Sequence, residues 1–264
     1  MARATLKQIC RLIDTVTDTL PIEQQFLDDL KKSIEIDNKN HSRKPSQTYK
    51  PSSMNCLRNM YYQVTGAESS CDDPTYSTIG ICNSGSDIHI RVQQAVTSMK
   101  ECGYDCEYID VADFVTSRDL DYLNIVDKSG METKLYHKDL NMSFLCDGII
   151  RYKSHYYILE LKTETSYKWN SRKGVDSKHY NQATAYSIAF KLPEIIFVYI
   201  CRDTLDMKAY MYVPTDEQKQ DLIGKIDECD KCVKEHKVPD KPIELPKNLC
   251  NYCAYKHLCE SEKL

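Results

Sequence analysis

The chain has 264 residues, which allows one large domain or two small ones and a substantial core without disulfide bonds. Its formal net charge of −4 excludes a global basic field, so any binding to nucleic acid must come from local patches. No apolar run approaches the roughly 18 residues of a membrane span, and Asp14 interrupts the place where a signal peptide needs apolar residues, so we expect no membrane insertion and no secretion.

The pattern of apolar residues predicts helices and strands in a mixed order. Helices are expected over residues 4–36 (two, broken at Pro21), 52–64, 84–100, 176–191 and 215–236. Strands are expected over residues 106–115, 131–137, 143–152, 155–163, 194–201 and 207–213. A polar connector over residues 38–52 separates the first helices from the rest. The expected organisation is therefore an N-terminal helical region, residues 1–45, and a larger domain, residues 46–264.

A basic stretch with interleaved tyrosines follows the connector. From Asn38 to Ala67 there is no acidic residue, while lysines, arginines and tyrosines alternate. Such a mixture suits a surface that follows a nucleic-acid backbone, and it makes Arg58 and Tyr61 candidates for contacts with DNA. A solvated linker followed by an ordinary helix explains the same composition, so both interpretations stay open.

The most informative stretch is residues 145–164, which predicts a hairpin turning near Lys153 and Ser154. This turn would place Asp147 directly opposite Glu160, with Lys162 on the same face. Two facing carboxylates repel each other, and a Mg²⁺ or Mn²⁺ ion between them would remove the penalty and could activate water against a phosphodiester. The alternative is a surface hairpin with alternating polar residues.

Three residues elsewhere could complete such a site. Gln182 and Tyr186 are spaced i,i+4 on one helix face, where Gln182 could hold water or a phosphate and Tyr186 could contact the nucleic-acid backbone. His89 could add a nitrogen ligand, although a lone helical histidine is more often structural or merely exposed.

A basic segment follows the hairpin and predicts attraction of phosphates. Its candidates for contacts with DNA are Lys168, Trp169, Arg172, Lys173 and Lys178, with Trp169 able to stack on an unpaired base. An exposed mobile loop is the alternative, and the two interpretations are compatible.

The cysteines indicate a metal site rather than disulfide bonds. There are 13, an odd number in a chain with no export signal, which favours a reducing compartment. Cys250, Cys253 and Cys259 form a C-x2-C-x5-C tail. The first two also give zinc-ribbon spacing with Cys229 and Cys232, but Cys229 continues the apolar face of its helix and is expected in the core. Four thiolates suit zinc or an iron–sulfur cluster equally.

Taken in order, six motifs resemble those of the PD-(D/E)XK nuclease superfamily, in its RecB-like branch with a [4Fe-4S] cluster, which includes CRISPR-associated and phage-borne exonucleases. The motifs are C-x-R-x-x-Y-Y from Cys56 to Tyr62, G-x-x-x-H from Gly85 to His89, Asp147-Gly148, E-x-K from Glu160 to Lys162, Q-x-x-x-Y from Gln182 to Tyr186, and the cysteine tail. The resemblance covers residues 52–260. Leu57 stands where the family often has proline.

The resemblance implies a restriction-endonuclease-like α/β core, a mixed central sheet flanked by helices, with an iron–sulfur clasp that joins Cys56 to the cysteine tail. It implies that His89, Asp147, Glu160 and the backbone carbonyl of Leu161 bind Mg²⁺ or Mn²⁺, with Lys162 as the catalytic lysine.

The implied activity is that of a deoxyribonuclease acting on single-stranded DNA ends, in the cytoplasm of a bacterium or a phage-infected host. Recombination or CRISPR partner proteins and an oligomer are compatible with it. The alternatives are an inactive nuclease fold that binds DNA or a partner protein, and a zinc-ribbon nucleic-acid-binding protein.

Overall fold

The computed structural model describes residues 20–41, 46–69, 73–129, 131–242 and 249–261. The chain divides into two compact units, one of Met1–Lys44 with Asp72–Cys82 and one of Pro45–Cys71 with Asn83–Leu264. The first of the two helices predicted over residues 4–36 falls mostly outside the described residues.

The first unit contains helix α2 (Ile22–Asn40), which begins directly after Pro21 as predicted. Proline suits the start of a helix because the first N–H groups of a helix have no intrahelical partner. The first turns of α4 (Tyr76–Ser98) belong to the same unit. There the Glu35 carboxylate accepts a hydrogen bond of 2.9 Å from the main-chain nitrogen of Tyr76, and Lys39 pairs with Asp73 at 2.6 Å.

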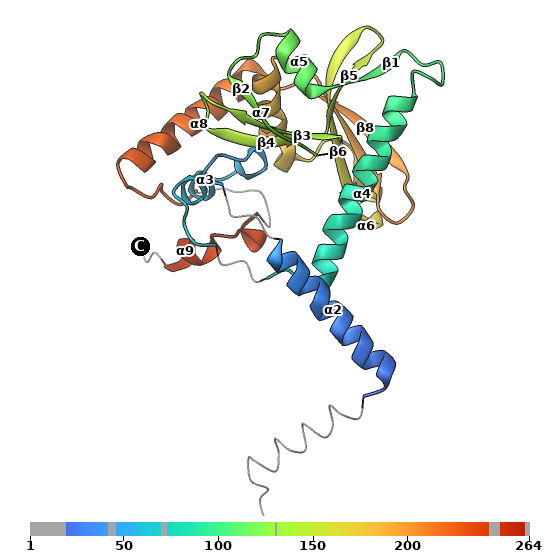
Figure 1. Ribbon diagram of the computed structural model, residues 1–264. Coiled ribbons are helices and arrows are strands. Elements are labelled where there is room, and N and C mark those ends of the chain that lie inside the picture. Colours follow the sequence, from blue (N-terminus) through green and yellow to red (C-terminus); the bar gives the residue numbers. More distant parts are fainter. Residues whose placement is uncertain (1–19, 42–45, 70–72, 130, 243–248, 262–264) are drawn as a thin grey trace, which may run out of the picture. The chain divides into compact units, whose positions relative to one another are not determined.

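The second unit contains a five-stranded mixed sheet in the order β1-β5-β6-β7-β8 (Figure 1). Its strands are β1 (Cys106–Ile109), β5 (Gly148–Tyr152), β6 (His155–Glu164), β7 (Ile195–Cys201) and β8 (Met207–Tyr212). Only the central pair, β6 and β7, is parallel. The β5–β6 turn has positive φ at Lys153 (48°) and Ser154 (68°), as a tight two-residue hairpin turn requires. Gly148 pairs with Leu159, which is the predicted register.

A separate three-stranded antiparallel sheet has the order β2-β3-β4. Its strands are β2 (Leu123–Ser129), β3 (Glu132–His137) and β4 (Met142–Cys146). The predicted strand over residues 143–152 is therefore wrong, since it is two strands in two sheets that separate at Asp147. The predicted strand over residues 106–115 is also too long. The Asp110 carboxylate accepts hydrogen bonds from the N–H groups of Ala112 and Asp113 and so starts helix α5 (Val111–Ser117).

Helices cover both faces of the five-stranded sheet. The remaining helices of this unit are α3 (Leu57–Val64), α6 (Ser166–Ser171), α7 (Tyr180–Phe190), α8 (Asp216–Lys234) and α9 (Lys256–Ser261), with short 3₁₀ turns η1 (Pro51–Ser53), η2 (Ser177–His179) and η3 (Leu249–Tyr252). On one face, α7 and α8 pack on strand residues such as Ile158 and Phe197. On the other, Val92 and neighbouring residues of α4 pack on Leu159 and Leu161, which point into the core as predicted.

This is a mixed α/β fold with a central mixed sheet flanked by helices, as predicted, and it is compatible with a restriction-endonuclease-like core. Within the described residues, no helix combines the length and the apolar character that crossing a membrane requires.

Candidate metal-binding active site

Asp147 lies at the point where the chain passes from one sheet to the other. β4 ends at Cys146 and β5 begins at Gly148, so Asp147 belongs to neither strand. It is 8% exposed, and its Oδ2 atom accepts a hydrogen bond of 2.7 Å from the main-chain nitrogen of Leu161 on β6. The carboxylate is thereby fixed at the seam between the two sheets.

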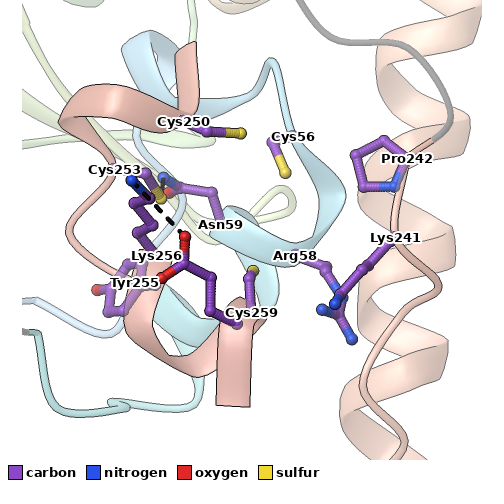
Figure 2. Close-up of a pocket in the computed structure, with 11 residues that line it drawn as sticks. Cys56, Arg58, Asn59, Lys241, Pro242, Cys250, Cys253, Tyr255, Lys256 and Cys259 are labelled. Atoms are coloured by element: carbon purple, nitrogen blue, oxygen red, sulfur yellow. Dashed lines mark hydrogen bonds and ion pairs between the residues drawn. The ribbon is translucent and has the colours of Figure 1, made fainter. Parts of the chain in front are cut away.

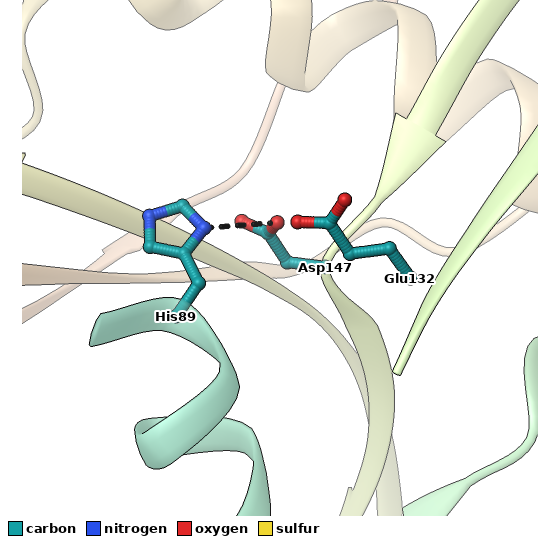
Figure 3. Close-up of side chains that lie close together, drawn as sticks. All are labelled: His89, Glu132 and Asp147. Carbon is teal, nitrogen blue, oxygen red and sulfur yellow. Dashed lines mark ion pairs between the residues drawn. The ribbon is translucent and has the colours of Figure 1, made fainter. Parts of the chain in front are cut away.

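Two further side chains converge on Asp147 from different elements (Figure 3). His89, on α4, places its Nδ1 atom 3.4 Å from Oδ1 of Asp147, and Glu132, the first residue of β3, faces the same carboxylate from the other side. The three ligand atoms lie within 4.8 Å of one another, a spacing that no other such group of His, Cys, Asp and Glu reaches among the described residues. One nitrogen and two carboxylates fit a divalent cation such as Mg²⁺ or Mn²⁺.

Glu160 and Lys162 lie beside this group on β6 and are hydrogen-bonded to each other. Lys162 Nζ donates to Glu160 Oε1 at 2.5 Å, and Gln182 Nε2 donates to the same oxygen at 2.7 Å. Gln182 also donates to the hydroxyl of Tyr186 at 2.9 Å, and that hydroxyl donates to the carbonyl of Leu145 at 2.8 Å. Tyr186 is buried, so it orients Gln182, and the prediction that it contacts the nucleic-acid backbone is corrected.

Burial and mutual repulsion raise the pKa values of two acidic groups in the site. Burial raises the pKa of Glu160 to about 7, although the positive charge of Lys162 acts in the opposite direction. Burial also raises the pKa of Glu132, and the negative charge of Asp147 adds to that shift. Burial therefore disfavours the ionised form of both carboxyl groups, and a cation bound beside them would favour that form again.

The pKa values of the two basic groups beside these acids are also raised. Burial by itself would lower the pKa of Lys162 and of His89. The neighbouring Glu160 outweighs that effect for Lys162, and the Asp147 carboxylate outweighs it for His89, so both pKa values are raised. Lys162 is held as an ammonium group next to the acids.

Sequence reasoning missed Glu132. The strand that it begins was predicted over residues 131–137, and the next strand was predicted from residue 143. In the β3–β4 hairpin that these strands form, Thr133 pairs with Cys146, so Glu132 lies opposite Asp147. Counting residues across this hairpin was the signal that could have identified Glu132. The structure thus adds Glu132 to the predicted set of His89, Asp147 and Glu160.

The four cysteines expected at the clasp line one cavity of about 250 Å³ between α3 and the C-terminal segment (Figure 2). They are Cys56, Cys250, Cys253 and Cys259. Burial raises the pKa of the Cys56 thiol, while the N–H groups at the start of α3 act to lower it. Asn59 Nδ2 donates to the sulfur of Cys253 at 3.4 Å, and the rings of Tyr62 and Tyr255 pack 5.7 Å apart. Donors to sulfur are what thiolate ligands need.

The zinc-ribbon arrangement is not assembled. Cys229 is fully buried in the core on α8, as predicted, and burial raises the pKa of its thiol to about 11. Neither Cys229 nor Cys232 lines the cavity that holds Cys250 and Cys253.

Two predicted DNA contacts on α3 are wrong because both side chains are buried. Arg58 is 5% exposed and its Nε atom donates to the carbonyl of Pro239 at 2.7 Å, while Tyr61 is 8% exposed and belongs to the core. Both residues stabilise the packing of α3.

The basic segment after β6 divides into a buried and an exposed part. Arg172 is buried against Glu164, with Nε 2.6 Å from Oε2, and its guanidinium lies 4.0 Å from the centre of the Tyr199 ring, so the prediction that it contacts DNA is wrong. Lys168 and Lys178 are partly exposed beside Asp176, at 3.3 Å and 3.8 Å.

The other two candidates in this segment, Lys173 and Trp169, differ in their exposure. Lys173 is exposed. Trp169 is half-buried, donates from Nε1 to the carbonyl of Tyr199 at 3.3 Å and carries the ammonium group of Lys208 over its ring at 3.9 Å. That ring face is therefore covered, whereas Tyr167 is 86% exposed.

Comparisons with known proteins give no family assignment: no protein-family model matches the chain, and no curated protein matches it. Among solved structures, the chain resembles SSO0001, with 17% identity and a TM-score of 0.47, over 91% of this chain and 98% of that one. It also resembles LHK-Exo in complex with dAMP, with 9% identity and a TM-score of 0.40, over 73% of this chain and 90% of that one.

Proposed function

We propose that this protein is a Mg²⁺- or Mn²⁺-dependent deoxyribonuclease that hydrolyses phosphodiester bonds. The observation that carries the proposal is the seam itself, where His89, Glu132 and Asp147 converge within 4.8 Å, next to the Glu160–Lys162 pair. A partly buried lysine beside acidic metal ligands suits phosphodiester hydrolysis, because the pentacoordinate phosphate gains negative charge as water attacks.

The donors present fit a hard divalent cation. His89, Asp147 and Glu132 would hold it, with Glu160 as a further carboxylate. The Leu161 carbonyl is a further candidate, because N–H and C=O of one strand residue point to the same side and the N–H of Leu161 points at Asp147. When bound, the cation lowers the pKa of a bound water and polarises a phosphate oxygen.

The chain's own residues would do the rest. Lys162 keeps its proton beside Glu160, and its ammonium group would neutralise charge on the phosphate or orient the attacking water. Gln182, anchored by Tyr186, fixes the Glu160 carboxylate from the opposite side.

We propose DNA with single-stranded ends as the substrate. Support comes from the cations of the segment after β6 that remain exposed or partly exposed, Lys168, Lys173 and Lys178, and from the exposed ring of Tyr167. Lysines attract phosphates, and an exposed tyrosine can stack on an unpaired base without reading its sequence.

We further propose that the four-cysteine cavity holds a [4Fe-4S] cluster. Around one zinc ion, four sulfurs would lie only about 3.8 Å apart, because the Zn–S distance is about 2.3 Å in a tetrahedron. In the described part of the chain, no three cysteine sulfurs lie within 4.8 Å of one another. Four thiols that line one cavity are the ligand set that a [4Fe-4S] cluster uses. Iron and sulfide analysis of anaerobically purified protein tests this, and one equivalent of zinc without iron would refute it.

The decisive test of the activity is digestion of end-labelled single- and double-stranded DNA with Mg²⁺ or Mn²⁺. Wild-type protein should digest single-stranded DNA, and Lys162→Ala and Asp147→Asn should lose at least about 100-fold in rate, the scale for loss of one strong electrostatic contribution to a transition state. The surface variant Lys153→Ala, on the β5–β6 turn, serves as the matched lysine control. Full digestion by Lys162→Ala would show that the assigned site is wrong. DNA binding without any cleavage by wild-type protein would favour a binding module.

A further inference from the structure

The main-chain carbonyl of Asp147 is held by two side chains that the proposed chemistry does not use. Gln93 Nε2 donates to it at 2.6 Å, and the hydroxyl of Tyr108 donates to it at 2.7 Å. Gln93 is fully buried and lies one helical turn after His89 on α4, so α4 contacts both the side chain and the backbone of Asp147. Because only an NH₂ group can donate to a carbonyl, this contact also fixes which way the Gln93 amide points.

The same tyrosine hydroxyl reaches the other acidic strand. It lies 3.0 Å from the carbonyl of Met131, the residue directly before Glu132. A hydroxyl has one proton, which the two carbonyls share. Tyr108, on β1, therefore links the backbone beside Glu132 to the backbone of Asp147. These two positions come directly after the last pair of the β3–β4 ladder, Thr133 with Cys146, at the point where strand pairing ends and the chain passes into the other sheet.

The position of the Tyr108 ring is itself fixed by a glycine. A Cβ atom on Gly148 would lie 2.6 Å from Cε2 of Tyr108 and 2.9 Å from its hydroxyl oxygen. Only glycine lets the ring pack this closely against the backbone that follows Asp147. Asp147 thus supplies a candidate metal ligand, and Gly148 leaves space for the Tyr108 ring, whose hydroxyl holds the backbone of that ligand.

We infer that Tyr108 is a positioning residue that holds the backbones beside Glu132 and Asp147 together just beyond the last β3–β4 pair, and so raises the affinity of the site for a divalent cation, with Gln93 as the second donor. The inference rests on the proposed function, since it assumes that the two carboxylates share a cation. Groups that orient metal ligands from behind typically change metal affinity by about 10- to 100-fold when they are removed.

The test measures Mn²⁺ binding to the purified full chain by calorimetry and by the electron paramagnetic resonance signal of free Mn²⁺, with no DNA present. Tyr108→Phe removes only the hydroxyl and keeps the ring against Gly148. The matched control is Tyr122→Phe, which removes a tyrosine hydroxyl that also donates to a main-chain carbonyl, that of Ala189, at 3.0 Å. We expect Tyr108→Phe to bind Mn²⁺ about 10-fold more weakly and Tyr122→Phe to bind it as wild type does.

The outcomes separate the inference from the function on which it rests. If wild-type protein binds Mn²⁺ and Asp147→Asn abolishes binding, the cation site stands, and equal affinity of Tyr108→Phe and wild type would then overturn the positioning role. If wild-type protein shows no Asp147-dependent binding, the proposed metal site itself falls. Gln93→Met removes the second donor at similar size, and weaker binding by this variant supports the inference should Tyr108→Phe fail to fold.

Discussion

The raised pKa of Glu160 makes a quantitative prediction about the metal-free protein. A carboxyl group whose pKa is higher in the folded than in the unfolded protein destabilises the folded state when it is ionised. Its cost is therefore absent well below the unfolded pKa of 4.5, grows as the pH rises from there to the folded pKa of about 7, and is constant above it. A difference of about 2.5 pKa units corresponds to about 3 kcal/mol at 1.36 kcal/mol per unit.

Glu160→Gln removes the ionisation and keeps the shape. The free energy of unfolding of the variant and of wild type is measured in urea with EDTA present. The gap between the two values should move in favour of the variant by about 2 to 3 kcal/mol between pH 5 and pH 8.5. Saturating Mg²⁺ should shrink the gap, because a bound cation stabilises only the ionised wild-type site. Glu101→Gln makes the same substitution at an exposed residue and serves as the control.

A gap that stays constant with pH would refute the reasoning. It would mean that Glu160 is ionised in the folded protein throughout this range, and that Lys162 compensates fully for its burial. A depressed folded pKa would also leave the gap nearly constant here, because its stabilisation is already present above the unfolded pKa of 4.5.

Three further predictions concern other parts of the molecule. Gly148→Ala should displace the ring packed against it, lower stability by about 2 kcal/mol in urea unfolding, and weaken Mn²⁺ binding; unchanged Mn²⁺ affinity would contradict it. Cys253→Ala should lose the visible absorbance of an iron–sulfur cluster and lower the melting temperature, and an unaltered melting curve would refute a stabilising clasp. Arg172→Ala should cost about 2 kcal/mol, because the buried Glu164 would keep only its longer ion pair with Lys168 at 3.5 Å. Lys173→Ala should change stability by less than about 0.5 kcal/mol and weaken binding to single-stranded DNA in a fluorescence anisotropy titration; the reverse pattern would contradict the division into buried and exposed cations.

The local parts of the site were predictable from the sequence. A two-residue turn fixes the register of a hairpin, so the pairing of Gly148 with Leu159, and with it the approach of Asp147 to Glu160, followed from counting residues. The i,i+4 spacing of Gln182 and Tyr186 likewise places them on one helix face, where they do bond to each other.

The non-local parts were not predictable in the same way. Residues 143–152 alternate in a manner that fits one strand, and nothing in that pattern marks the divergence of the sheets at Asp147. Sequence also shows charge without showing its partner. Arg58 and Arg172 read as free cations, whereas one donates to the carbonyl of Pro239 and the other binds Glu164 in the interior.

The division of the site between two sheets has a consequence for the order of folding. Glu160 and Lys162 lie on the hairpin that joins β5 to β6, which closes through contacts that are short in sequence and therefore fast to form. Glu132 and Asp147 come together on a second hairpin, β3–β4, which must then pack beside the first. Affinity for a divalent cation should thus be the last property to appear during refolding, after most secondary structure, and nuclease activity would be confined to chains that have finished folding.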